Sequence, residues 1–153
     1  MAGTTGSAVT TCPGCGRRNR LPVAARGRVR CPACHTDLPW LVDVGDADFD
    51  AAVRNSPVPV LVDVWAPWCG PCRAVTPVVE QLARDRAGAL KVVKVNADGA
   101  PGVSGRLSVR GIPTLLLFAD GQERARVVGA QPAAVLTRWV DDHLAGSGIS
   151  SAD

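Results

Sequence analysis

Hydrophobic positions change their spacing near Trp40, and this change divides the chain into two parts. Residues 10–37 contain few large apolar side chains, so this segment needs a staple because it cannot bury enough surface to fold alone. From Trp40 onward, apolar runs alternate with amphipathic stretches. We therefore expect flexible tails at 1–9 and 146–153, a stapled module at 10–37 and a larger domain at 40–145.

Strands and helices alternate in the pattern that follows Trp40. Val58–Trp65 and Leu90–Asn96 are nearly continuous apolar runs, which is typical of strands buried on both faces of a sheet. Asp120-Gly121 predicts a tight hairpin turn. The first predicted elements are a strand at 41–44 and a helix capped by Asp46 that carries Phe49 and Val53. Strands at 58–65 and 90–96 then flank a helix at 69–87, and a short helix follows at 99–108. The last elements are strands at 114–118 and 124–128 and a helix that begins at Pro132. This β-α-β-α-β-α-β-β-α order predicts an α/β fold with a mixed central sheet flanked by helices.

Charge is distributed unevenly between the two parts. The formal net charge is +3, yet residues 10–37 hold six Arg against one Asp, a net of +5, which leaves −2 for the rest of the chain. Four thiolates around a Zn²⁺ ion would add a charge of about −2 to residues 10–37 and offset part of their positive charge. Residues 10–37 also offer no aromatic platform on which nucleic-acid bases could stack. We therefore do not expect a nucleic-acid partner.

The apolar runs are too short for a membrane protein, because none approaches the roughly 18 residues that a membrane helix needs. The first residues, MAGTTGSAVTT, have neither the basic nor the apolar region of a secretory signal. Both observations predict a cytoplasmic protein with no membrane partner. In a reducing cytoplasm, paired cysteines bind metal or carry out catalysis more often than they form structural disulfides. Nothing in the sequence demands more than a monomer, so we expect one.

Two Cys-x-x-Cys pairs in the basic part have the spacing of a zinc ribbon. Cys12 and Cys15 form the first pair, Cys31 and Cys34 form the second, and fifteen residues separate the pairs. Each pair makes a tight turn that directs two sulfurs to one point, so that four thiolates complete a tetrahedron around Zn²⁺. We interpret all four as ligands of one structural zinc ion, which supplies the folding energy that this segment lacks. Two structural disulfides, a redox switch, and His35 as a ligand in place of Cys34 are the alternatives.

A third pair, Cys69 and Cys72, lies between a predicted buried strand and a predicted helix. Gly70 and Pro71 separate the two thiols, and proline suits the first turn of a helix. Free N–H groups and the helix dipole at this end favour the thiolate of Cys69. Cys69 would attack a substrate disulfide, and Cys72, one helical turn further on, would resolve the mixed disulfide.

Asp63 interrupts the apolar strand that precedes this pair. A carboxyl buried there is expected to have a raised pKa and to suit proton transfer, whereas a solvated strand end is the alternative. Lys94, on the neighbouring predicted strand, is a candidate charge partner, although a lone lysine is more often a surface residue. A cis bond at Ile112-Pro113 would present backbone groups beside the thiols, but X–Pro bonds are rarely cis, so the sequence does not establish one.

The segment Val62–Arg73, VDVWAPWCGPCR, resembles the active-site segment of the thioredoxins. Gly111–Phe118, GIPTLLLF, resembles their cis-proline strand, and Lys94–Asn96 matches their lysine-bearing strand. The likeness covers residues 40–145 without a large insertion. With the two N-terminal Cys-x-x-Cys pairs added, the whole chain is similar to the zinc-containing bacterial thioredoxins, the thioredoxin 2 type.

This resemblance implies a thiol–disulfide oxidoreductase that reduces disulfides in cytosolic client proteins. It makes Cys69 the nucleophile, Cys72 the resolving thiol and Asp63 the buried proton-transfer group, with Lys94 near it. A thioredoxin reductase would supply the electrons, so that the chain itself would bind Zn²⁺ but no flavin or nicotinamide. The resemblance also implies an apolar rim that grips an extended client segment, formed by Trp68, Gly70, Pro71, Ile112, Pro113 and Gly129.

Other functions remain open at this point. The same fold serves disulfide oxidases and isomerases, although the Gly-Pro dipeptide and the missing signal peptide favour a reductase. A basic zinc module on a scaffold domain would instead be a binding module, which would keep its function in a variant that lacks both Cys69 and Cys72. Loss of zinc on oxidation, as a regulator of the reductase, is a third hypothesis, supported only by the nearness of the thiols in sequence.

Overall fold

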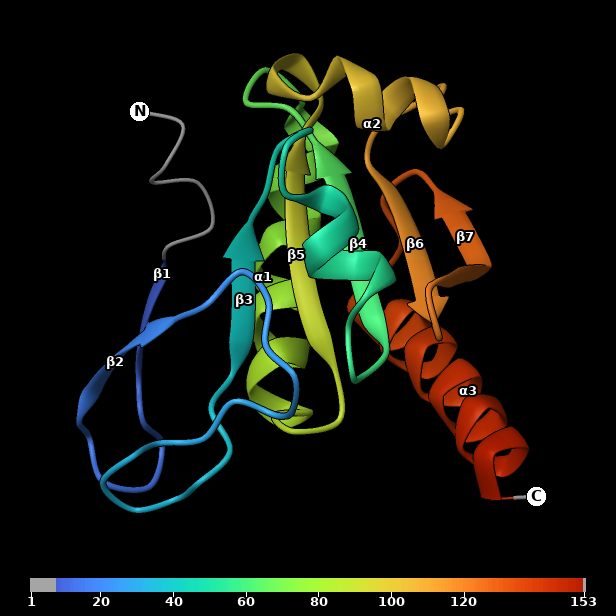
Figure 1. Ribbon diagram of the computed structural model, residues 1–153. Helices are drawn as coiled ribbons and strands as arrows, with labels where there is room; N and C mark the ends of the chain where they lie inside the picture. Colours follow the sequence, from blue (N-terminus) through green and yellow to red (C-terminus); the bar gives the residue numbers. More distant parts are fainter. Residues whose placement is uncertain (1–7, 153) are drawn as a thin grey trace.

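A mixed five-stranded sheet forms the centre of this computed structural model, which describes residues 8–152 (Figure 1). In spatial order its strands are β3 (Trp40–Asp43), β5 (Lys91–Asn96), β4 (Val60–Trp65), β6 (Thr114–Ala119) and β7 (Gln122–Val128). β5 pairs in parallel with β3 and β4, whereas β6 is antiparallel to β4 and β7. The hairpin between β6 and β7 turns at Asp120 and Gly121, both with positive φ (54° and 77°), as an Asp-Gly turn of this kind requires.

Helices cover both faces of the sheet. On one face, α1 (Gly70–Asp85) and α3 (Ala133–Ala152) contribute Val75 and Leu136 to an apolar cluster with Leu61 of β4. On the other face, Val62 of β4 lies in a second cluster with Phe49 and Val103. The elements on that side are η2 (Asp50–Arg54), η3 (Ala97–Gly99) and α2 (Pro101–Arg106). No helix in the described residues combines the length and the apolar character that crossing a bilayer requires. The expected α/β fold, with a mixed sheet flanked by helices, is confirmed.

The residues before the sheet form a small module that contains the first two cysteine pairs. β1 (Ala8–Thr11) and β2 (Arg18–Leu21) make an antiparallel hairpin that lies beside β3, at the edge of the sheet (Figure 1). Leu21 and Leu38 are buried in the same apolar cluster as Val42 of β3. The module therefore shares a core with the larger domain, and this contact compensates for its own shortage of apolar residues.

Both segments expected to be flexible tails reach into regular elements. β1 begins at Ala8, which pairs with Leu21, so the tail expected at 1–9 overlaps a strand. α3 continues to Ala152 through the tail expected at 146–153, since each residue added to a formed helix gains a backbone hydrogen bond. Residues 1–7 and 153 lie outside the described part of the chain.

Asp46 does not cap a helix of its own segment, so that prediction was wrong. Phe49 precedes the short η2, which has no side-chain cap. The carboxylate of Asp46 instead accepts hydrogen bonds from the backbone N–H groups of Gly102 (3.0 Å) and Val103 (2.8 Å) at the start of α2. The first N–H groups of any helix lack partners within the helix, and the preceding residue, Ala100, offers none. Asp46 thus supplies the cap of α2 from a distant part of the sequence.

Candidate functional site

Cys69 and Cys72 lie where β4 leads into α1. Cys69 is the N-cap of α1, and the sulfur of Cys69 accepts a hydrogen bond from the backbone N–H of Cys72 at 3.2 Å. The two residues form a disulfide with their Cα atoms 5.4 Å apart, and both are buried. Pro71 occupies the first turn, where its missing N–H costs no helical hydrogen bond. When the disulfide is reduced, the helix N-terminus favours the thiolate of Cys69.

Asp63 is buried in the middle of β4, only 1% exposed. Because side chains alternate along a strand, it shares a face with Leu61, which α1 and α3 cover. Neither carboxyl oxygen has a hydrogen-bond partner among the described residues. Burial raises the pKa of Asp63 to about 6, although the charge of Lys94 opposes this effect. The alternative of a solvated strand end is thereby excluded, and Asp63 is a buried acid that titrates near neutral pH.

Lys94 lies directly beside Asp63, because the two are register partners in the parallel pair β4–β5. The ammonium of Lys94 also lies over the ring of Trp65, 5.0 Å from its centroid. The sequence expectation that Lys94 is near the buried carboxyl is met by this arrangement. Lys94 stabilises the ionised form of Asp63 and thereby limits the rise in its pKa.

The loop before β6 brings Ile112, the residue before a proline, next to the disulfide. The Ile112–Pro113 peptide bond is cis, as the resemblance implied. Ile112 packs against the small buried cluster that contains Cys69 and Cys72. The backbone N–H of Gly129 donates to the carbonyl of Pro113 at 2.8 Å, which ties the end of β7 to this loop. The expected rim residues Ile112, Pro113 and Gly129 therefore lie close together, with Ile112 against the two cysteines.

Trp68 precedes Cys69 and is 68% exposed. Its indole N–H donates to both carboxylate oxygens of Asp98, at 3.3 and 3.0 Å. Asp98 is held in turn by Asn96, whose side chain accepts from the backbone N–H of Asp98 at 3.0 Å. Asp98 is absent from the residues predicted from the sequence, because nothing local to it signals a partner thirty positions away. Gly70 and Pro71, the other expected rim residues, are exposed beside Trp68.

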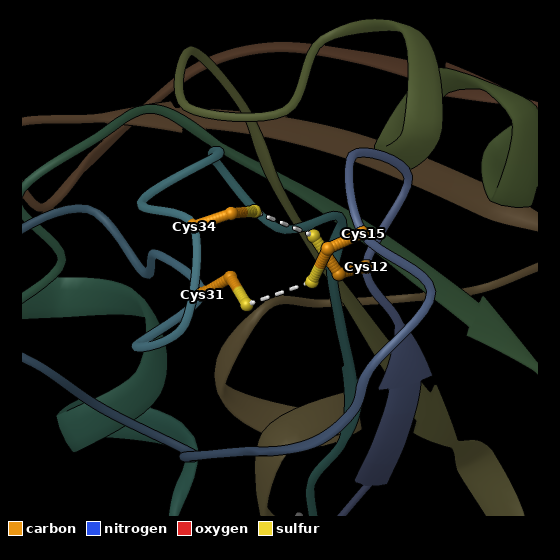
Figure 2. Close-up of side chains that lie close together, drawn as sticks. All are labelled: Cys12, Cys15, Cys31 and Cys34. Atoms are coloured by element: carbon orange, nitrogen blue, oxygen red, sulfur yellow. Dashed lines mark hydrogen bonds between the residues drawn. The ribbon is translucent and has the colours of Figure 1, made fainter.

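The first two cysteine pairs converge in space. Figure 2 shows the four side chains pointing toward one another from two loops, and their sulfurs all lie within 4.8 Å of one another. The closest sulfurs are those of Cys12 and Cys34 at 3.4 Å and those of Cys15 and Cys31 at 3.6 Å. Four converging thiols form the donor set that tetrahedral Zn²⁺ prefers, so the residues fit such an ion.

The two cysteine loops have the same backbone geometry. The backbone N–H of Gly16 donates to the carbonyl of Cys12 at 2.9 Å, and that of His35 donates to the carbonyl of Cys31 at 2.7 Å. Gly16 and His35 both have positive φ, 80° and 66°. His35 is thus the counterpart of Gly16 at the end of a turn, and its ring is not part of the group of four converging cysteine sulfurs. The geometry favours four cysteine ligands over the histidine alternative.

Lys91 joins the module to the larger domain, a contact that the sequence pattern does not reveal. Its side chain is fully buried, and its ammonium donates to the carbonyls of Val23 in the module and Ala52 in η2. The same ammonium lies 4.2 Å from the centroid of the Trp40 ring. Trp40 donates from its indole N–H to the carbonyl of Pro22 at 2.9 Å. Burial lowers the pKa of Lys91 to about 8.

Comparison with known proteins identifies relatives of this chain. Residues 41–142 match the family model described as Thioredoxin. Thioredoxin 1 of Synechococcus elongatus is 52% identical over 101 residues, which cover 66% of this chain and 94% of the relative. Thioredoxin of Haemophilus influenzae is 44% identical over 104 residues, which cover 68% of this chain and 97% of the relative. The chloroplastic Thioredoxin M4 of Arabidopsis thaliana is 37% identical over 140 residues, which cover 90% of this chain and 72% of the relative.

Proposed function

Because this chain belongs to the thioredoxin family, we propose that its Cys69–Cys72 pair reduces disulfides in client proteins and is restored by a thioredoxin reductase. The chain is a thiol–disulfide oxidoreductase of the protein-disulfide reductase class. The observation that carries the residue assignment is the position of this pair at the start of α1, directly after the strand β4 that carries a buried carboxyl. We place the reaction in the cytoplasm, where a reducing environment keeps the dithiol available.

The reaction proceeds in two exchanges. The thiolate of Cys69 attacks one sulfur of a client disulfide, forms a mixed disulfide and releases the other client sulfur as a thiolate. The thiol of Cys72 then gives its proton to Asp63, and its thiolate attacks the sulfur of Cys69. This step forms the Cys69–Cys72 bond and releases the second client thiolate. Two electrons pass to the client, two protons complete its thiols, and the reductase later returns two electrons to this pair.

Asp63 suits the role of proton acceptor because of its surroundings. Its pKa of about 6 leaves it mostly ionised at neutral pH, so it is able to take a proton from Cys72. Its oxygens are free of hydrogen bonds within the described chain and are therefore available for that proton. Lys94, its register partner, stabilises the carboxylate between turnovers.

The rim around the dithiol is the proposed site for the client segment. Trp68 offers a large exposed apolar surface directly before Cys69, Ile112 packs against the cysteines, and Gly129 is hydrogen-bonded to Pro113 beside it. Gly70 and Pro71, both exposed, leave the approach to the sulfur of Cys69 unobstructed by long side chains. An extended peptide that carries a disulfide would lie across this rim.

Four cysteines are proposed to hold one structural Zn²⁺ ion: Cys12, Cys15, Cys31 and Cys34. With four thiolate ligands the ion has no open position for water or substrate, so it supplies folding energy and no chemistry. The convergence of these four thiols supports the proposal that the chain is a zinc-containing thioredoxin of the bacterial thioredoxin 2 type. Electrons are proposed to arrive from outside, through the reductase, and not through a flavin or nicotinamide of this chain.

Turnover of insulin by NADPH and a thioredoxin reductase tests the proposal. The wild-type protein should sustain NADPH consumption, Cys69→Ser should abolish it, and Cys72→Ser should accumulate a stable mixed disulfide with insulin. Thr76→Ser, one turn further along α1, is the matched control and should keep the wild-type rate. A binding module would show no turnover in the wild type, and equal rates in wild type and Cys69→Ser would reject the assignment of the nucleophile.

A further inference from the structure

Three charged residues form a row across the sheet. Lys94 of β5 is the register partner of Asp63 on β4 and also of Asp43 on β3. The neighbouring row on the same face, two residues earlier in each strand, is apolar, with Val92 paired to Leu41 and Leu61. Because partners in register share a face, the carboxyls of Asp43 and Asp63 flank Lys94 on the side of the sheet that α1 and α3 cover.

The two carboxyls differ in their access to water. Asp63 is buried, whereas Asp43 ends the edge strand β3 and is exposed. Neighbouring strands are about 4.8 Å apart, so the backbones of the two acids are separated by roughly 10 Å. At such a distance, and with protein between them, two negative charges still repel each other appreciably. One lysine is therefore shared by two acids that disfavour each other's ionised form.

Few charged groups act on Asp63. Within the described part of the chain, the two groups whose charge acts on it are Lys94, which favours its ionised form, and Asp43, which opposes it. On its other flank, β6 presents Leu115 as the register partner of Asp63. α1, which packs over this face, begins directly after Cys69 and carries Cys72 in its first turn, and the residues of α3 buried against the face are apolar. Asp43 is consequently the one negative side chain of this set besides Asp63 itself.

We propose that Asp43 is a positioning residue for proton transfer at Asp63, because it competes for Lys94 and makes Asp63 a stronger base toward the thiol of Cys72. This inference rests on the proposed function of the dithiol. Asp43 touches neither client nor thiols and acts only through the charge balance of the row. Removing its charge leaves Asp63 as the one carboxylate that the charge of Lys94 stabilises in this row and removes a repulsion, and both effects favour the Asp63 carboxylate.

A titration of Asp63 in the oxidised protein measures this directly, by NMR of its carboxyl carbon. In Asp43→Asn the pKa of Asp63 should fall by about half a unit or more, a factor of about three in its proton dissociation constant. In Asp43→Lys, which changes the charge by two, the fall should be larger. Asp142→Asn on α3 removes an equal charge elsewhere and should leave the titration unchanged.

The same variants separate this inference from the proposed function. In insulin reduction, the acidic limb of the pH profile should move to lower pH in Asp43→Asn, further in Asp43→Lys, and not in Asp142→Asn. A wild-type protein that turns over insulin, with unchanged Asp63 titration in both Asp43 variants, would overturn the role of Asp43 alone. A shift of equal size in Asp142→Asn would also overturn it, because the effect would then be one of net charge. A wild-type protein without turnover would instead reject the proposed function.

Discussion

Asp63 shows how the surroundings of one residue decide its chemistry. In an apolar strand, with no hydrogen-bond partner in the described chain, its carboxyl holds a proton up to a pH of about 6. An ordinary aspartate in an unfolded chain loses its proton at a pH of about 3.9. The folded state therefore binds a proton more tightly than the unfolded state between these values, and ionising Asp63 above this range destabilises the fold.

Replacing Asp63 with asparagine should raise the free energy of unfolding at pH 7. With a pKa of about 6 for Asp63, the variant should be more stable than the wild type by about 2 to 3 kcal/mol above pH 6.5. This difference in stability should shrink as the pH falls toward 4. Urea unfolding of wild type and Asp63→Asn at several pH values measures the difference. A gain that is independent of pH would contradict the assignment to ionisation. The variant should also reduce insulin more slowly, because Cys72 loses its proton acceptor.

His35 adopts a backbone conformation that glycine holds at the equivalent place in the other cysteine loop, with φ of 66° against 80° for Gly16. His35→Gly should therefore leave the stability and the zinc content unchanged, since glycine adopts this conformation without steric cost. His35→Val should lower the stability by about 1 to 2 kcal/mol, because a β-branched side chain is strained there. Zinc stoichiometry and urea unfolding provide the readout. Loss of zinc in His35→Gly would show that the histidine is a ligand after all.

At the scale of elements, the first residue of β5 joins three segments. Lys91 donates to carbonyls of the module and of η2 while its ammonium lies over the ring of Trp40 on β3. No carboxylate forms an ion pair with it among the described residues, so carbonyl dipoles and an aromatic face alone compensate its charge. Such a buried lysine fixes the module in one position but costs free energy to desolvate.

The stability difference between wild type and Lys91→Met should depend on pH. Burial lowers the folded-state pKa of Lys91 to about 8, below the unfolded value of about 10.4, so the unfolded state binds more protons in this window. As the pH rises from 7.5 to 10, the free energy of unfolding of the wild type should therefore increase by about 1 to 3 kcal/mol relative to that of Lys91→Met. The chain contains no tyrosine to titrate there. A constant difference across this range would mean that Lys91 is not buried in solution.

At the scale of the whole molecule, the module and the domain share one apolar cluster, and the two groups of cysteines lie in different clusters. Cys12 and Cys31 are buried in the same apolar cluster as Trp40 and Val42 of the sheet. The redox pair belongs to a different small cluster, formed where β4 meets α1. The four-cysteine group is therefore coupled to the stability of the domain, while the dithiol is built from elements outside the module.

Removing the metal should affect stability more than activity. Treatment with a strong chelator is expected to expose the cysteines of the module and to lower the Tm, since metal binding supplies the folding energy of this segment. Insulin reduction at a temperature below the new Tm should remain within about twofold of the rate of the zinc-loaded protein. A tenfold loss of activity in a protein that is still folded would instead support regulation of the reductase by zinc.

Short-range signals were enough to predict most of the fold and the thiol groups. The apolar runs gave the buried strands, and Asp120-Gly121 gave the hairpin between β6 and β7. The spacing of the first four cysteines predicted their convergence, which four sulfurs within 4.8 Å confirm. These features depend on residues close in sequence or on repeated motifs, whose local geometry is largely independent of the rest of the chain.

Contacts between distant residues were not predictable in the same way. Asp46 caps α2 from across the fold, Asp98 holds Trp68, and Lys91 reaches back to Val23. The local sequence around each of these side chains predicts only an ordinary exposed position. Its partner is decided by how the sheet and its loops pack. The partners of such charged residues become known only from the strand register and the burial in the structure. The pairing of Asp43 with Lys94 is a further example.

The reduction potential of the Cys69–Cys72 pair, measured against glutathione with zinc retained, decides whether this chain reduces client disulfides. A reductant of client disulfides should show a two-electron midpoint near −270 mV, about the value typical of thioredoxins. A midpoint near −120 mV, about that of a strong disulfide oxidant, would contradict a reductase. A pair that does not titrate at all would contradict any redox role for this site.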